Sequence, residues 1–229
     1  NDICKNVIAS YTADKVYELA SEWAKTYDSE LYTLLTRDEA LSKAMFGFDR
    51  NPDKPRKDIA KWSEVRNAFS FMFDELFENK YDEIANIEKS DIAALLDAYI
   101  CMYDENADSS LWFDTLKDLS EKFGFAREVK EYKKNPDAYK GHVGDVSNVI
   151  RVAVTGRTKS PDLYSIMQTL GNSLVIVVFP AVGICPRNSR VFNTECFEIS
   201  DSVIRVAQER IISLMDRYRF KTVFVAKRL

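Results

Sequence analysis

The side chains that most often do chemistry in proteins are scarce in this 229-residue chain. It has one histidine, His142, and four cysteines, Cys4, Cys101, Cys185 and Cys196, which form no CxxC pair. Structural zinc needs four ligands at short characteristic spacings, and a disulfide framework needs a higher density of cysteines. The sequence therefore predicts no metal site, and its cysteine usage favours a reducing, cytoplasmic setting.

Paired carboxylates offer a second route to catalysis, by general acid and base transfer. Asp74 with Glu75 and Glu128 with Glu131 are such pairs, but helix surfaces commonly carry them without any catalytic role. The sequence contains no nucleophile motif, so we predict no catalytic residues, with a self-contained enzyme as an alternative.

Positive charge is concentrated in the second half of the chain. The formal net charge is −4 overall, but it is −11 over residues 1–120, +4 over 121–160 and +3 over 161–229. This asymmetry favours a polyanion as partner of the second half. The alternative is a solvated surface of mixed charge.

Helices are the elements that must position these charges. Seven glycines in 229 residues is less than half the usual share of about 7%, too few for a β-sandwich or a glycine-loop nucleotide-binding fold. Apolar spacings of three, four and seven, with capping residues, predict helices. These run from Thr12 to about Tyr27, from Ser29 or Glu30 to about Phe46, from caps at Ser90 and Ser110, over Val146 to Val154, and from Pro161 to Gly171; Trp62 to Phe77 is also apolar on one side.

The character of the sequence changes after Gly171. The run SLVIVVF, Ser173 to Phe179, predicts a buried strand, and Arg190 to Ile199 and Thr222 to Ala226 predict two more. A helix capped by Asp201 or Ser202 lies between them. The longest apolar stretch, Leu174 to Val182, is about half of the roughly 20 residues that a membrane span requires, so we expect no membrane segment.

Two stretches closely resemble the C-terminal half of bacterial glutamyl-tRNA synthetases: residues 54–75, KPRKDIAKWSEVRNAFSFMFDE, and residues 121–171. The family's pattern is Arg, a small apolar run, Thr-Gly, a short loop, Pro, Leu and a final Leu-Gly. Here it reads Arg151, Thr155, Gly156, Pro161, Leu163, Leu170 and Gly171. The stretch ELASEWAKTYDSEL looks like the same family's first helices, so the resemblance covers roughly residues 1–171.

The resemblance implies a mainly α fold with two helical anticodon-binding subdomains, residues 1–118 and 119–229. Residues 172–220 are then an insertion or an extension, with a small α+β unit as one form of it. The final KTVFVAKRL looks like the family's lysine-rich ending resumed, in which case the strand predicted at Thr222 would be helical.

The implied partner is tRNA-Glu, with tRNA-Gln as the alternative or additional substrate. The HIGH-type and KMSKS-type motifs that bind ATP in class I synthetases are missing from this sequence. The resemblance therefore implies that ATP and magnesium act in a separate N-terminal catalytic domain, and that this chain alone is an inactive, cytoplasmic monomer. The chain begins at Asn1 without a methionine, so we expect a fragment of a longer protein.

Bases in a single-stranded loop can be read on their edges, and an arginine fork suits two-point contact with a base or phosphate. In the family, the matching Arg and the Thr/Ser-Pro-x-Leu stretch lie against the second and third anticodon bases. Carried over, these residues are Arg151, Ser160, Pro161 and Leu163, with Ser160 where relatives usually have Thr. The first-base reader lies in a stretch resembling KPRKD, which gives Arg56 or, as the alternative, Lys57.

Basic side chains near these residues are candidates for contact with the tRNA backbone, which positions RNA without reading its sequence. They are Arg127, Lys130, Lys133, Lys134, Lys140 and Arg157. Tyr132 and Tyr139 are candidates for base stacking or for anchoring the loop, and His142 for bracing the loop or touching RNA. A helical protein-interaction module, its acidic first half docking a basic partner, is the alternative to RNA binding.

Overall fold

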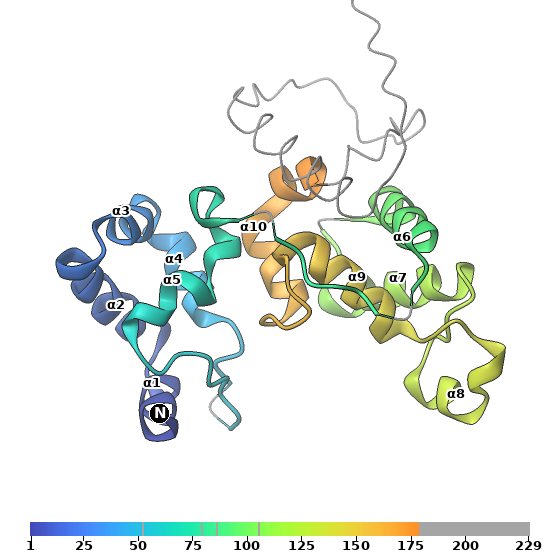
Figure 1. The fold of residues 1–229 in the computed structure, drawn as a ribbon, viewed down its shortest axis with the longest axis horizontal. Helices are drawn as coiled ribbons and strands as arrows, with labels where there is room; N and C mark the ends of the chain where they lie inside the picture. The colour runs from blue at the N-terminus through green and yellow to red at the C-terminus, as the bar shows by residue number, and fades with distance from the viewer. Residues whose placement is uncertain (52, 79, 86, 105, 179–229) are drawn as a thin grey trace, which may run out of the picture. The chain divides into compact units, whose positions relative to one another are not determined.

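The computed structural model describes residues 1–178, except 52, 79, 86 and 105. This part of the chain is built from helices and contains no strand, so the predicted mainly α fold is confirmed (Figure 1). The α-helices are α1 (Asp2–Ser10), α2 (Ala13–Tyr27), α3 (Ser29–Arg37), α4 (Glu39–Gly47), α5 (Val65–Ala68), α6 (Lys89–Met102), α7 (Ser109–Lys122), α8 (Val129–Lys134), α9 (Val143–Thr155) and α10 (Leu163–Val178). Four short 3-10 helices lie at Trp62–Glu64, Ser70–Met72, Asp74–Leu76 and Pro136–Ala138.

The chain divides into two compact units. Of the described residues, unit 1 contains those in 1–78 and 159–170, and unit 2 contains those in 79–158 and 171–178. The boundary predicted between residues 118 and 119 falls within α7. The division into two anticodon-binding subdomains stays a prediction.

Helix caps decide where the first helices of unit 1 begin. The Thr12 hydroxyl accepts the N–H of Lys15 at 3.2 Å, and α2 runs to Tyr27 as predicted. The single helix predicted from Ser29 to Phe46 is wrong, because Asp38 leaves helical geometry (φ −138°) and its carboxylate accepts the N–H of Leu41 at 2.9 Å. An aspartate in this role starts a new helix, so α3 and α4 are separate.

Residues 62–77 pack their apolar face without forming one long helix. The chain makes short 3-10 turns and the single turn α5 here. The five apolar residues that share this face are all buried: Val65, Phe69, Met72, Phe73 and Leu76. From α5, the Arg66 guanidinium donates two hydrogen bonds to the Asp28 carboxylate, at 2.7 and 2.6 Å, and lowers its pKa. This pair fixes the apolar segment to the start of α3.

The core of unit 2 forms where α6, α7 and α9 pack against one another. Tyr99 and Leu116 are fully buried in it, and the Trp112 indole N–H donates to the Tyr99 hydroxyl at 2.8 Å. The predicted caps at Ser90 and Ser110 are wrong. Helix α6 follows Glu88, and α7 is capped by the Asp108 carboxylate, which accepts the N–H of Leu111 at 2.9 Å.

Helix α10 begins and breaks at identifiable residues. It begins at Leu163, not at Pro161 as predicted, because the Asp162 carboxylate accepts the N–H of Ser165 at 2.8 Å and so caps it. It breaks at Gly171, where φ is 67° and ψ −177°. The predicted end at Gly171 therefore corresponds to a kink.

The strand predicted over Ser173–Phe179 is wrong for residues 173–178, whose backbone is helical. Strand propensity of β-branched residues depends strongly on context and does not forbid a helix. The strands predicted at Arg190–Ile199 and Thr222–Ala226, the helix capped at Asp201 or Ser202, and residues 179–220 of the proposed insertion lie outside the described residues.

Candidate nucleic-acid interface

Residues 125–142 of unit 2 form a loop that is closed at its base, and we call it the basic loop. The N–H of Ala126 donates to the carbonyl of Gly141, and the N–H of Val143 donates to the carbonyl of Ala126, both at 2.9 Å. Helix α8 and the 3-10 turn Pro136–Ala138 lie between these two ends (Figure 1). A loop closed in this way presents its side chains from a fixed base.

His142 braces the basic loop by capping α9. Its Nδ1 accepts the N–H of Gly144 at 3.0 Å, and its own N–H donates to Asp145 Oδ2 at 2.8 Å, which completes a reciprocal capping box. A Cβ added at Gly144 would lie 2.8 Å from His142 Cε1. The histidine therefore has the bracing role, one of the two that the sequence left open.

Both candidate stacking tyrosines contact other residues of the basic loop. The Tyr132 ring meets the His142 ring edge-on, with 5.5 Å between centroids. The Tyr139 hydroxyl donates to Glu131 Oε1 at 2.6 Å, and this bond raises the pKa of Tyr139. These contacts match the loop-anchoring role.

The predicted backbone-contacting side chains of the basic loop fall into two groups. Arg127 Nη1 lies 2.5 Å from Asp118 Oδ1 and 2.8 Å from Glu121 Oε2, and Lys140 Nζ lies 2.7 Å from Asp91 Oδ2. The members of the other group are exposed and make no ion pair with any described residue: Lys130, Lys133 and Lys134. Of these two groups, only the second can bind a phosphate without first breaking an ion pair with a carboxylate of the protein.

A second segment, residues 155–162, follows α9, and we call it the strap. Gly156 has φ 74° and ends α9, and its carbonyl accepts the N–H of Asp82 at 2.8 Å. The Asp82 carboxylate accepts the N–H and the hydroxyl of Thr158, at 2.7 and 2.9 Å. Within unit 2, Asp82 thus holds the first part of the strap. Arg157 in the strap and Arg151 in α9 are both half-buried.

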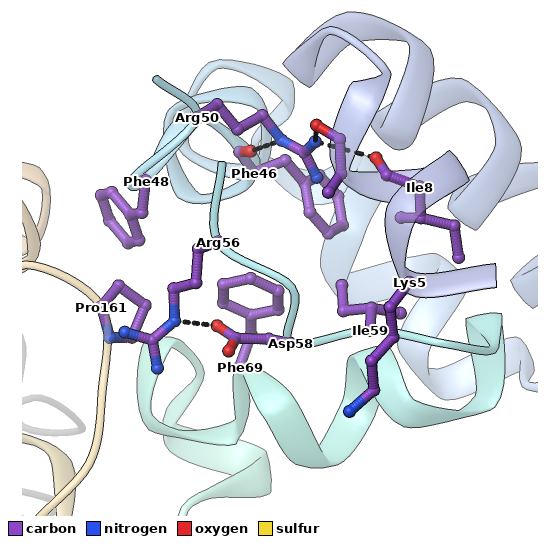
Figure 2. A pocket seen from close by; sticks show the side chains of 11 residues that line it. Lys5, Ile8, Phe46, Phe48, Arg50, Arg56, Asp58, Ile59, Phe69 and Pro161 are labelled. Atoms are coloured by element: carbon purple, nitrogen blue, oxygen red, sulfur yellow. Dashed lines mark hydrogen bonds and ion pairs between the residues drawn. The ribbon is translucent and has the colours of Figure 1, made fainter. Parts of the chain in front are cut away.

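In unit 1, Arg56 holds the second part of the strap (Figure 2). Its Nη1 donates to the carbonyl of Ser160 at 2.5 Å, and its Nε pairs with the Asp58 carboxylate. The same Nη1 lies 3.6 Å from Asp49 Oδ2, which accepts the N–H of Asp162 at 3.0 Å. The arginine predicted to read the first base is therefore bound to the protein's own backbone, whereas Lys57 is exposed.

Three of the residues predicted to lie against the other two bases are buried in the free chain. Ser160 is 8% exposed and Leu163 1% exposed. Pro161 is also buried and lines a cavity of about 20 Å³ with Phe48 and Phe69, among others (Figure 2). A cavity of this size holds about one water molecule, not a base. The roles of Pro161 and Leu163 as apolar contacts of an unstacked base, and of Ser160 as a small donor or acceptor, stay predictions.

The structure gives no sign of other chemistry in the residues it describes. Among them, no three histidine, cysteine, aspartate or glutamate side chains gather as metal ligands. None of the helices in this part is both long and apolar enough to cross a bilayer. Cys4 and Cys101 are free and exposed, and Cys185 and Cys196 lie outside the described residues.

Comparison with known proteins places the chain in a family. The family model of the anticodon binding domain matches residues 56–176, which is more than half of the chain. The chain therefore belongs to the anticodon binding domain family. The match includes the Arg56 segment, the basic loop and the strap.

The curated relatives are glutamate–tRNA ligases. The chain is 42% identical to that of Clostridium perfringens strain 13 over 179 residues, which are 76% of this chain and 33% of the relative. It is 41% identical to that of Acetivibrio thermocellus over 177 residues, which are 76% of this chain and 32% of the relative. It is 35% identical to that of Sorangium cellulosum over 175 residues, which are 76% of this chain and 31% of the relative. The chain spans about a third of the length of these relatives and corresponds to their C-terminal region, so the predicted resemblance is confirmed.

Proposed function

We propose that this chain is the part of a glutamate–tRNA ligase that recognises the anticodon loop of its tRNA. The observation that carries the proposal is the anticodon binding domain match over residues 56–176, together with 35–42% identity to glutamate–tRNA ligases. The three lysines of α8 that have no partner among the described residues support it, because phosphate contacts supply most of the sequence-independent affinity for RNA.

Recognition divides between two kinds of residue. Lys130, Lys133 and Lys134 attract and position the RNA backbone, and Arg127, Lys140 and Arg157 add to them when RNA competes for their charges. The base-reading residues are Arg151, Ser160, Pro161 and Leu163, with Arg56 or, as the alternative, the exposed Lys57 for the first base. For the buried Ser160, Pro161 and Leu163, the proposal requires that RNA binding exposes their side chains while the backbone of the strap stays held.

The remaining parts of the proposal concern the longer protein. We propose tRNA-Glu as the RNA, with tRNA-Gln as a second substrate if the enzyme accepts both. ATP and magnesium then bind in a separate catalytic domain, and this chain alone is a cytoplasmic monomer that does not aminoacylate tRNA.

The test is filter binding of this chain to anticodon stem-loops of tRNA-Glu and tRNA-Gln, with swapped anticodons, at two salt concentrations. We expect binding that weakens steeply with salt, and Arg151→Ala should lose about tenfold of the preference for the cognate anticodon, since one good two-point contact discriminates by about that much. The control is Arg37→Ala, which removes an exposed arginine from α3. An unchanged preference in Arg151→Ala would show that this arginine does not read a base.

A second candidate function, a protein-interaction module, is favoured by one observation in unit 1. An open apolar groove of about 540 Å³ lies between α1 and the 3-10 turn at Trp62, where Ile3 is 79% and Val7 45% exposed. Exposed apolar surface of this kind marks protein contacts. Binding of cell proteins that resists RNase, with no salt-dependent RNA binding, would favour this function over the first.

A further inference from the structure

Lys159 stands between two residues of the strap that are each held by a distant partner. Before it, Thr158 donates its N–H and hydroxyl to Asp82, at 2.7 and 2.9 Å. After it, the carbonyl of Ser160 accepts from Arg56 Nη1 at 2.5 Å. Lys159 itself is exposed and has no ion pair or side-chain hydrogen bond with any residue that the structure describes.

The strap is held once more beyond Lys159. Asp49 adopts φ 52°, a left-handed conformation that aspartate tolerates better than most residues, and its Oδ2 accepts the N–H of Asp162 at 3.0 Å. Its carbonyl accepts the N–H of Arg56 at 3.0 Å. Asp49 and Arg56 together therefore hold the peptide groups on both sides of Pro161.

The carboxylates around the strap already have donors of their own. Asp82 accepts from Thr158, Asp58 from Arg56, and Asp162 from the N–H and hydroxyl of Ser165, both at 2.8 Å. Their charges are thereby partly stabilised within the protein. The ammonium of Lys159 has no such partner among the described residues and is available to an outside anion.

We propose that Lys159 contacts a phosphate of the bound RNA, and that Arg56 and Asp49 are positioning residues that hold its backbone in place. The proposal rests on the proposed function, because it is the family's RNA partner that brings the phosphate. A backbone fixed before binding loses less conformational entropy on binding, so one lysine here contributes more than one on a free loop. It also gives Arg56 a role other than base reading.

The test is filter binding of the whole chain to a tRNA-Glu anticodon stem-loop over a range of salt concentrations. Lys159→Ala should weaken binding about fivefold, reduce the slope of log K against log salt by about 0.7, and leave the preference among anticodons unchanged. Lys25→Ala is the matched control, because Lys25 is also exposed, in unit 1 and without a partner among the described residues. It should bind as the unmodified chain does.

Two outcomes would overturn the proposal, and they are distinguishable. If the unmodified chain binds RNA with a steep salt dependence and Lys159→Ala binds equally well, the contact is wrong and the proposed function stands. If the unmodified chain shows no salt-dependent RNA binding, the proposed function itself is wrong and this inference falls with it.

A double-mutant cycle tests the positioning role. Arg56→Lys keeps the positive charge but loses the planar fork, and Asp49→Gly, which tolerates the same left-handed backbone, removes the carboxylate that accepts the N–H of Asp162. In either background, Lys159→Ala should cost less than twofold in place of fivefold, with melting temperatures showing that the chain still folds. An equal, fivefold cost in all backgrounds would show that Arg56 and Asp49 do not position Lys159.

Discussion

The basic loop and the strap both carry side chains assigned to RNA, but the protein holds them in different ways. The basic loop, residues 125–142, is braced by its own neighbours, through the Ala126–Gly141 hydrogen bond and the His142 cap. The strap, residues 155–162, is held by Asp82, Arg56 and Asp49, which lie 76, 104 and 113 residues away from their partners in sequence. The first arrangement depends on local sequence, and the second on the folding of each unit.

The two regions also expose their charges differently. The basic loop presents on one short helix three exposed lysines without an ion pair to any residue in the described part of the chain, whereas most of the strap is buried or bound to the protein. Phosphate attraction and base reading therefore place opposite demands on the chain. A residue that attracts RNA must be free in the unbound protein, and a residue that reads a base needs a fixed and partly desolvated position.

The largest expected effect tests the role of the basic loop. The triple variant Lys130→Ala, Lys133→Ala, Lys134→Ala removes the exposed charges of α8 and should reduce the salt slope by about 2, since each contact adds about 0.7. Affinity for the anticodon stem-loop should fall about a hundredfold, with the preference among anticodons retained. The measurement is filter binding over a salt series.

The matched control for the triple variant is Lys25→Ala, Lys61→Ala, Lys122→Ala, which removes three other exposed lysines. An equal loss of affinity in both triple variants would mean that net charge, and not the basic loop, attracts the RNA.

The next effect tests the long-range bracing of the strap. Asp82→Ala leaves the N–H and hydroxyl of Thr158 without their acceptor and should lower the free energy of unfolding by about 2 kcal/mol. The Thr158 amide should also lose its protection from hydrogen exchange, whereas the amides of Ala126 and Val143 in the basic loop keep theirs. Asp137→Ala, which removes an exposed carboxylate, is the control. Exchange that rises equally in both regions would remove the contrast between them.

The smallest effect tests the local bracing of the basic loop. Gly144→Ala places a Cβ 2.8 Å from His142 Cε1 and 2.9 Å from its Nδ1, so the cap of α9 must move. Loss of a cap costs about 1 kcal/mol, which urea denaturation can measure. At Gly47, an added Cβ meets only Ala13 Cβ at 3.9 Å, so Gly47→Ala should leave stability unchanged or slightly raised. Equal stability of the two variants would show that His142 is not a structural cap.

The sequence alone predicted those helix boundaries that are determined by residues close to them in the chain. The Thr12 cap, the end of α2 at Tyr27 and the glycine at 171 each act within a few residues; the structure agrees with the first two, and at Gly171 it has a kink where the sequence predicted a helix end. The break at Asp38 was missed because the apolar spacing continues across it. Helix α1 was also missed, although Ile3, Val7 and Ile8 recur at helical spacing, since its N-cap, Asn1, makes no side-chain cap to mark its start.

The candidate site was predictable only in part. The family pattern from Arg151 to Gly171 identified the segment, and the family match confirms it. Nothing in the sequence near Thr158 or Ser160 points to Asp82 or Arg56, because only folding brings these residues together. The hydrogen bonds by which Asp82 and Arg56 hold the strap could therefore be found only from the structure.

The kink in α10 depends on the backbone conformation of Gly171. An added Cβ would meet no atom within 4 Å, so packing does not explain the glycine, but its φ of 67° and ψ of −177° form a combination that is essentially closed to L-amino acids. An L-alanine at this position would favour a straight rod through all 16 residues of α10, about 24 Å long. A D-alanine would keep the bend, so the handedness of a single methyl group decides whether α10 is straight or kinked at this residue.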